Sequence, residues 1–486
     1  MGTFTYSDLI ALDLGKLNAA VTDWKTMVGE LAKLKDDARD GLLKKSEQAR
    51  WEGVDASVTR EFVRKTVKEF DDLHMEAQSV HNVLADAHTE LSHIQKRARD
   101  LTDEARRGNP NRSPEPDPPL LVTDGGNGTV RVMEAVCDVK GTSQRTKDRV
   151  RWYADTLTGL VAHAAEVDAA VTRALKRSHG GDPHNAGHAG YTSLDEDQLP
   201  RAMKLASLGD DADNRQRAEL RRLWQSLSPE ARAQLWTKHK DDLLAAGILT
   251  PQAMRVSTDR GAGTYDTESP AARDHWTQVQ ATAMSNTGDF IGHVDAARHM
   301  DHYLRGLGTS LHLDVDRMLT DDPKLQATVE RSIAREEGEW RQRALEAFEK
   351  SGGRPVAIPV ETPPKGYTHE DRNWYLAVGS GMTNATGVVT VTPGDNGEPR
   401  VSLDYQVNVW DRYNWDPGKK TPIGPTEVTD ADMARLHVTG LAREFDMRGS
   451  GSVQHHDLSS SSSLPDPVDP GRDGKRTDIG RNGDAR

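Results

Sequence analysis

Apolar residues recur at alternating steps of four and three from Val63 to Leu101, and only Thr66 interrupts the series. A 3.5-residue repeat of this length specifies a long helix that supercoils around a partner. Alanine fills about every second position of this seam, so the helices can approach closely but bury little apolar area per turn. We therefore expect a helical pair that needs a third helix for stability.

The nearest partner precedes this helix in the chain. A second seam begins at Ile10 and runs in the same steps to Leu31, loosens at Lys35, and resumes at Ala38 and Leu42. Ser7 is a suitable N-cap. We predict a first helix over about residues 7–45, joined to the second by a short turn.

The third helix follows a proline-rich break at residues 109–119. Two β-prone runs, 120–123 and 129–132, flank a glycine-rich turn and predict a small hairpin. Steps of four and three then return between Tyr153 and Ala174, which predicts a helix over about residues 144–177. Residues 1–178 would form one three-helix module.

Composition limits the partners of the chain. Its 486 residues carry a formal net charge of −13, which does not favour nucleic acid as a partner. Cys137 is the single cysteine, so an intrachain disulfide is excluded. No window is apolar enough for a transmembrane segment. Residues 1–6 have neither the basic start nor the apolar core of a signal peptide, so we expect synthesis in the cytoplasm without a cleavable leader.

The remaining sequence divides by composition. Residues 179–198 are predicted as a linker and 199–350 as a helical spacer domain, in which Ser228, Pro229 and Glu230 start a helix that ends before Gly247. Residues 351–448 predict an antiparallel β domain with strands near 356–358, 374–378, 387–391 and 400–410, closed by a helix over 430–445. Residues 449–486 predict a disordered tail. The fold class is α+β.

The turn between the first two helices carries Trp51-Glu52-Gly53. Glycine tolerates unusual backbone angles there, and the tryptophan can fill the open end of the hairpin. In this context the hairpin resembles the Trp-x-Gly family exported by type VII (ESX) secretion systems. The third helix and small β-hairpin resemble the longer export domains that precede effectors in actinobacteria. A cytoplasmic coiled coil with an ordinary turn is the alternative.

The resemblance implies partners and a second signal. The partners would be the type VII secretion machinery and a small Trp-x-Gly protein. The family's Tyr-x-x-x-Asp/Glu signal matches Tyr191 and Asp195, unless this is a chance match at a helix start. Residues 223–230 resemble a segment that precedes an α/β-hydrolase in related proteins, but no Gly-x-Ser-x-Gly motif follows here.

His293, His299 and His302 lie close together in the sequence. On a helix, His299 and His302 would share a face, which allows a zinc site. The spacing fits no established zinc motif, so a solvated helix with incidental histidines is the alternative.

A polar and aromatic cluster follows the predicted strand at residues 400–410. Asp411, Tyr413, Asp416 and Lys419 would emerge at the strand end, where they could hold a divalent metal or a phosphate and supply acid–base chemistry. Asp411 and Tyr413 match part of the Asp-x-Tyr-Asp motif of colicin M-like lipid II phosphodiesterases. Asn414 replaces the second aspartate, and the following His-Arg is missing. A structural loop is the alternative.

These expectations combine into a secreted type VII effector, with an antibacterial or envelope-directed toxin as its payload and a cognate immunity protein as a further partner. If the payload is an enzyme, a hydrolase such as a lipid II phosphodiesterase is expected. The competing hypothesis is a non-enzymatic secreted protein that pairs with another Trp-x-Gly protein and binds a surface ligand.

Overall fold

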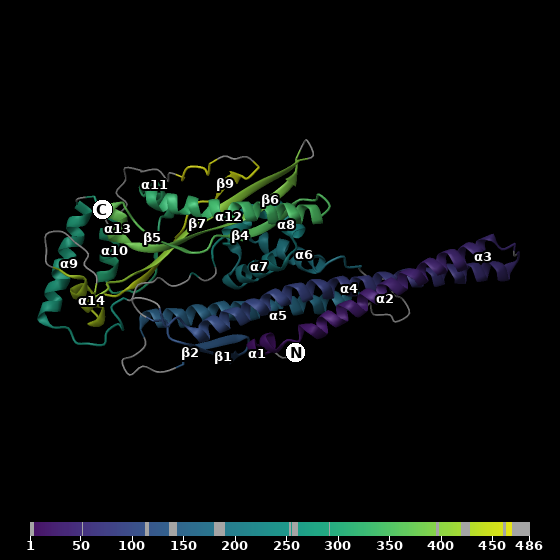
Figure 1. The fold of residues 1–486 in the computed structure, drawn as a ribbon, viewed down its shortest axis with the longest axis horizontal. Helices are drawn as coiled ribbons and strands as arrows, with labels where there is room; N and C mark the ends of the chain where they lie inside the picture. The colour runs from purple at the N-terminus through teal and green to yellow at the C-terminus, as the bar shows by residue number, and fades with distance from the viewer. Residues whose placement is uncertain are drawn as a thin grey trace, which may run out of the picture. The chain divides into compact units, whose positions relative to one another are not determined.

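The computed structural model describes residues 4–50, 52–111, 116–135, 143–178, 190–251, 254, 261–290, 292–394, 398–418, 428–459 and 463–468. The chain forms two compact units. The first comprises Met1–Thr142, Thr146–Ile248 and Arg354–Ala357, and the second comprises Ser143–Arg145, Leu249–Gly353 and Ile358–Arg486. The class is α+β, as predicted (Figure 1).

The first unit begins with the predicted helical hairpin. Its outgoing arm consists of α1 (Tyr6–Ala11), α2 (Leu14–Asp37), the π-helical turn η1 (Ala38–Leu43) and α3 (Lys44–Gln48), and α4 (Val54–Arg107) returns beside it. The outgoing arm is not one continuous helix, because Asp13 caps a new helix by accepting from the Lys16 amide at 3.1 Å. The N-cap of α1 is Thr5 rather than Ser7. The π-helical turn explains the loosened seam, since a wider turn shifts the apolar positions around the helix.

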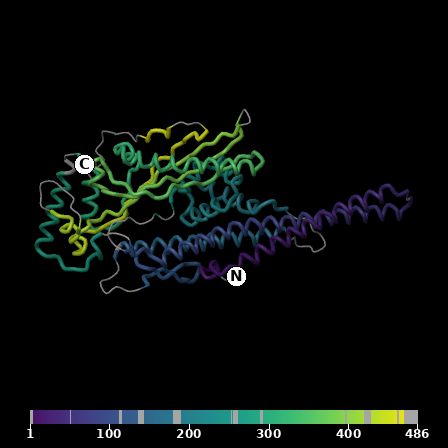
Figure 2. Tube along the Cα trace, in the orientation of Figure 1, coloured from purple at the N-terminus to yellow at the C-terminus, as the bar shows by residue number. Residues whose placement is uncertain are grey.

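The third helix, α5 (Gln144–Ser178), confirms the prediction and packs with α4 around one apolar core. The small hairpin is also present as β1 (Leu120–Gly126) and β2 (Thr129–Glu134), with positive φ angles at Asn127 and Gly128 in its turn. α1 is fixed to this core by side chains of α4, since the Tyr6 hydroxyl lies 2.7 Å from Thr102 Oγ1. Figure 2 lets the hairpin and α5 be followed along the Cα trace.

The described part of the first unit also contains three further helices, α6 (Asp195–Ala206), α7 (Asn214–Ser226) and α8 (Pro229–Ala245), with the 3-10 turn η2 (Gly209–Asp211) before α7. Ser228 caps α8 through its side chain, as predicted. These helices were predicted as part of a separate spacer over 199–350. Instead they belong to the same compact unit as the hairpin, and α6 begins inside the predicted linker.

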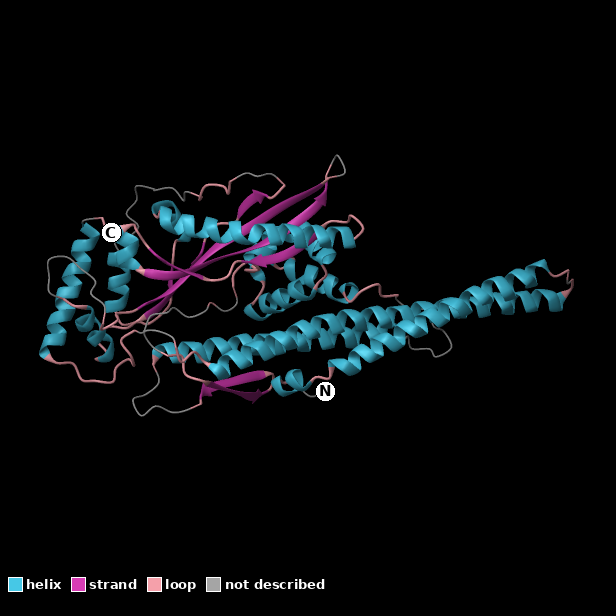
Figure 3. Ribbon diagram, in the orientation of Figure 1, coloured by secondary structure: helices cyan, strands magenta, loops and turns pink. Residues whose placement is uncertain are grey.

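The second unit is built on a seven-stranded sheet. Its strands are β3 (Leu311–His312), β4 (Val356–Glu361), β5 (Lys365–Thr368), β6 (Ser380–Pro393), β7 (Pro399–Tyr413), β8 (Phe445–Ser450) and β9 (Gln454–Asp457). The main order is β3-β8-β7-β6-β4, with β5 beside β6 and β9 beside β7. β7 pairs antiparallel with β6, β8 and β9, whereas β3 and β8 are parallel, so the sheet is mixed. Figure 3 draws the strands in magenta.

Helices of the second unit cover the sheet and its ends. They are α9 (Ala272–Phe290), α10 (Val294–Leu304), α11 (Val315–Asp321), α12 (Pro323–Lys350), α13 (Arg372–Ala377) and α14 (Asp430–Val438). α12 lies along the long strands β6 and β7, and α10 packs against α9 and α13. The second half of the predicted spacer therefore shares a core with the β domain.

Three predictions for the β domain were wrong. Residues 374–378 were predicted as a strand, but Asp371 accepts from the Trp374 amide and starts α13. The predicted helix over 430–445 ends at Val438, and Phe445 begins β8. The tail predicted from residue 449 contains the end of β8 and all of β9, because both strands pair with β7. Residues 469–486 and the linker residues 179–189 lie outside the described part of the chain.

Candidate functional site

The residues predicted as a site at the end of β7 do not emerge into one open cleft. Asp411 and Tyr413 are 5% and 6% exposed and share one face of the strand. The Tyr413 ring stacks on Phe445 at 4.9 Å, and its hydroxyl donates to Met300 Sδ at 3.8 Å. Burial raises the pKa of Tyr413 far above its usual value, so its hydroxyl keeps its proton near neutrality.

The next predicted residues follow the strand. Asp416 accepts a hydrogen bond from the Gly261 amide at 2.7 Å, which joins this loop to a segment far away in the sequence. Lys419 lies outside the described residues. Asp416 therefore lies in the loops beyond the strand, whereas Asp411 and Tyr413 lie within the strand and are buried.

Those loops surround a buried carboxyl group that the sequence did not single out. Glu444 immediately precedes β8, and its side chain is fully buried. Its Oε1 accepts from the Ala262 amide at 2.6 Å, and its Oε2 lies 3.4 Å from Arg412 Nε. A Cβ on Gly261 would lie 2.8 Å from Glu444 Oε2, so glycine is needed for this close approach. We call Glu444, Arg412, His437 and Asp416 the Glu444 cluster.

His437 of α14 faces the same carboxylate. The Glu444 amide donates to His437 Nδ1 at 3.1 Å, so Nδ1 carries no proton. His437 Nε2 then carries the proton of the neutral ring, and it lies 4.0 Å from Glu444 Oε2. This distance is too long for a hydrogen bond, so the imidazole and the carboxylate are neighbours without a direct bond.

The surroundings of Glu444 shift its pKa toward neutrality. Burial raises the pKa of Glu444 to about 7, although Arg412 and the Ala262 and Trp415 amides oppose this shift. A carboxylic acid that titrates near pH 7 suits general acid–base chemistry. The neighbouring guanidinium of Arg412 also pairs with Asp446 at 3.0 Å, which fixes its position.

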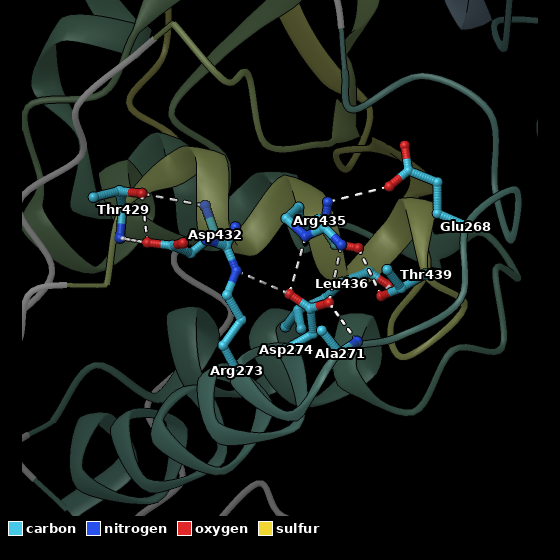
Figure 4. A network of polar contacts seen from close by, with 9 residues as sticks. All are labelled: Glu268, Ala271, Arg273, Asp274, Thr429, Asp432, Arg435, Leu436 and Thr439. Atoms are coloured by element: carbon cyan, nitrogen blue, oxygen red, sulfur yellow. Dashed lines mark hydrogen bonds and ion pairs between the residues drawn. The ribbon is translucent and has the colours of Figure 1, made fainter.

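A second ionic network fixes α14, the helix that carries His437. Figure 4 shows Arg435 between two carboxylates from the segment around the start of α9. Arg435 Nε and Nη2 lie 3.0 Å from the two oxygens of Asp274, and Nη1 lies 3.1 Å from Glu268. The Ala271 amide donates to the same Asp274 carboxylate at 2.8 Å. Because α14 cannot rotate without breaking this pair, its orientation, and with it His437, is fixed.

A third polar group lies deeper in the second unit. Asp322 caps α12, and its Oδ2 lies 2.5 Å from His369 Nδ1. His369 Nε2 lies 3.2 Å from the Tyr367 hydroxyl. Burial lowers the pKa of His369 although Asp322 opposes this, so the neutral ring donates from Nδ1 and accepts at Nε2. All three side chains are buried, and the network ties α12 to β5.

The three histidines predicted as metal candidates do not converge. His299 is buried and contacts the Ala377 carbonyl through Nδ1 at 2.8 Å, and burial lowers its pKa to about 4. His302 Nε2 contacts the Thr309 carbonyl at 2.8 Å, and His293 precedes α10. Within the described ranges, no set of three acidic, histidine or cysteine side chains is arranged to hold a metal ion.

The predicted export residues lie far apart on the first unit. Gly53 has a φ of 106° at the start of α4, and Trp51 is outside the described residues. Tyr191 is buried, and its amide donates to Ser79 Oγ at 2.8 Å. Asp195 accepts from the Ser228 amide at 2.9 Å. Because each helical residue adds about 1.5 Å, Gly53 and Ser79 are separated by roughly 40 Å along α4.

The hairpin also carries exposed apolar side chains. α2 has no buried residue, and the buried residues of α4 begin at Ala77 apart from Ala56. Val54, Val58 and Phe62 are 78%, 61% and 67% exposed and follow each other at steps of four on one face of α4. We call the part of the hairpin away from α5, which includes α3 and residues 54–76 of α4, the distal hairpin.

Comparison with known proteins adds no relative to these observations, because no family model, curated protein or solved structure matches the chain. Among the helices that the structure describes, none is long and apolar enough to cross a bilayer.

Proposed function

We propose that the chain is a type VII-type secreted effector, in which the distal hairpin binds a helical partner and the second unit is the payload. The observation that supports this proposal is the uncovered apolar face on the distal hairpin. Soluble proteins rarely expose aligned large apolar side chains unless the surface binds something.

The lengths of the helices explain why this face is uncovered. α4 has 54 residues and α5 has 35, which correspond to about 80 Å and about 50 Å at 1.5 Å per residue. Roughly 30 Å of α4 therefore extends beyond the third helix, as Figure 1 shows for the end of the hairpin near α3. A two-helix hairpin of this length gains little stability without a further helix.

The spacing of the exposed residues defines the partner. Val54, Val58 and Phe62 form a stripe that suits the apolar seam of an amphipathic helix. Burial of each side chain would contribute about 2 kcal/mol. A small helical-hairpin protein of the Trp-x-Gly type has this chemistry.

The proposed role of the distal hairpin is tested by charge substitution in the native host. The double variant Val58→Asp with Phe62→Asp changes exposed residues, so its melting temperature should stay close to that of the wild type. We expect it to disappear from the culture medium and to lose a co-purifying small helical protein. Val279→Asp, on α9 and 58% exposed, is the matched control. Normal secretion of the double variant, or of the wild type in a host without the type VII ATPase, would contradict the proposal.

The payload proposal is tested separately. We infer that an enzymatic payload would use Glu444 as its proton-transfer group, because its pKa lies near 7 and the side chains of Arg412 and His437 lie beside its carboxylate. The full chain behind a signal peptide should reduce colony counts when it is exported to a bacterial periplasm. Glu444→Gln should abolish this effect. Loss of the effect in a folded Asp411→Ala variant would instead support the colicin M-like hypothesis. A harmless wild-type chain would favour the alternative, a non-enzymatic binding protein.

A further inference from the structure

A pocket lies on the second unit, away from the Glu444 cluster. It is open to solvent, and the free volume left in it is small, about 20 Å³. Its apolar residues come from α11, α12 and β7, and are Leu319, Val329, Tyr405 and Val407. Its polar wall consists of Gln326 and Glu330 of α12 and Gln454 of β9. The Tyr405 hydroxyl donates to Gln454 Oε1 at 2.5 Å, which closes one side.

The chain itself supplies the remaining wall. Leu464, Pro465 and Pro467 line the pocket from a segment that has neither helix nor strand structure. In residues 463–468, Leu464 and Pro467 are partly buried and the others are exposed. A spacing of three matches the polyproline II helix, which has three residues per turn and places every third side chain on one face.

The sequence Leu464-Pro465-Asp466-Pro467 is predisposed to this conformation. Each proline has a fixed φ near −65°, and each residue before a proline is restricted to extended angles. Little conformational entropy is lost when such a segment binds. Prolines also have no amide hydrogen, so an apolar surface can cover them without leaving a buried donor unpaired.

The segment follows an anchored strand closely in the sequence. β9 pairs with residues 402–405 of β7, and Ser459 Oγ accepts from the Val401 amide at 2.8 Å. Few residues separate this anchor from Leu464, so the effective concentration of the segment at the pocket is in the millimolar range or above. A free peptide must compete with it.

We propose that this pocket is a binding site for extended, proline-containing peptides of the pattern Leu-Pro-x-Pro, and that residues 464–467 occupy it in cis. A segment of another protein with the same pattern binds when the cis segment is displaced or removed. The site is independent of the export proposal, since it uses only residues of the second unit.

The test measures binding of a labelled peptide with the sequence of residues 463–468 by fluorescence anisotropy. The full chain with Leu464→Asp and Pro467→Asp is the opened form, and a chain ending at Ser459 is a second opened form in case the first misfolds. We expect saturable binding to the opened forms and at least tenfold weaker binding to the wild type. Asp466→Ala, which changes an exposed residue, should behave like the wild type.

A peptide with one glycine inserted before its second proline is the specificity control, because it changes the spacing from three to four. It should bind at least tenfold more weakly to the opened forms. Absence of saturable binding to folded opened forms, or equal binding of the two peptides, would overturn the proposal.

Discussion

At the scale of single residues, Glu444 should make the stability of the second unit depend on pH. Its pKa is about 7 in the folded chain against 4.5 for an ordinary glutamate, so the folded state holds the proton over this interval while the unfolded state releases it. Its contribution to stability is therefore complete below about pH 4.5 and is lost as the pH rises through 7.

Glu444→Gln should remove this dependence. The free energy of unfolding of the wild type, minus that of the variant, should fall between pH 4.5 and 7 with a slope approaching about 1.4 kcal/mol per pH unit. Urea unfolding at several pH values measures this difference. Glu349→Gln, an exposed change on α12, is the matched control. A pH-independent difference for Glu444→Gln would show that the carboxyl is ionised throughout.

Two glycines in the hairpin should respond oppositely to alanine. Gly53 has φ 106° and ψ 178°, which side chains other than hydrogen rarely permit, so Gly53→Ala should destabilise the first unit by about 1–3 kcal/mol. Gly29 lies inside α2 with open space around it, so Gly29→Ala should stabilise by about 0.5–1 kcal/mol. Thermal unfolding followed by circular dichroism compares them. Equal effects would contradict the assigned turn geometry.

At the scale of elements, α12 depends on its cap. Asp322 accepts from the Lys324 and Leu325 amides and also from His369 and the Glu370 amide. Asp322→Asn keeps the shape of the side chain but removes the charge and one acceptor oxygen. We expect a loss of about 2–4 kcal/mol, more than the roughly 1 kcal/mol of an ordinary cap. Denaturant unfolding should show this, with Asp314→Asn, the exposed cap of α11, as the control. If Asp322→Asn and Asp314→Asn lowered the free energy of unfolding equally, the contact between Asp322 and His369 would contribute nothing to stability.

The elements also show what the sequence could predict. α4 and α5 were predicted closely because their apolar positions repeat over many turns. The strand assignment of residues 374–378 failed because β-prone side chains outweighed the cap at Asp371. The burial of Asp411 and Tyr413 was predictable, since the alternation from Val401 to Val409 continues to both residues.

The Glu444 cluster could not be predicted in the same way. His437 and Glu444 are close in sequence, but the amide of Ala262 and the side chain of Arg412 reach the carboxylate only through the tertiary fold. No periodicity marks such a meeting. The only local signal in the sequence is a glutamate directly before a strand. That signal does not indicate a site unless the residues that contact the glutamate are known.

At the scale of the whole molecule, two compact units predict two unfolding transitions. Leu157→Ala, in the core of the first unit, and Leu325→Ala, in that of the second, each remove a fully buried side chain at a cost of about 2–5 kcal/mol. Differential scanning calorimetry should show one transition shifted by each variant. A single transition shifted by both would mean that the units unfold cooperatively.

The strand order of the second unit has a consequence for synthesis. β7 pairs with β8 and β9, which follow it in the sequence at residues 445–450 and 454–457. β3 precedes its partner β8 by more than 100 residues, so it also cannot pair until β8 has been made. A ribosome adds about 5–20 residues per second, so the edge of β7 remains unpaired for several seconds after it is made. All of the first unit has been translated by then. A nascent chain therefore presents a finished helical module to the cell while its sheet is still open, and factors that bind unfolded segments meet the second unit in that interval.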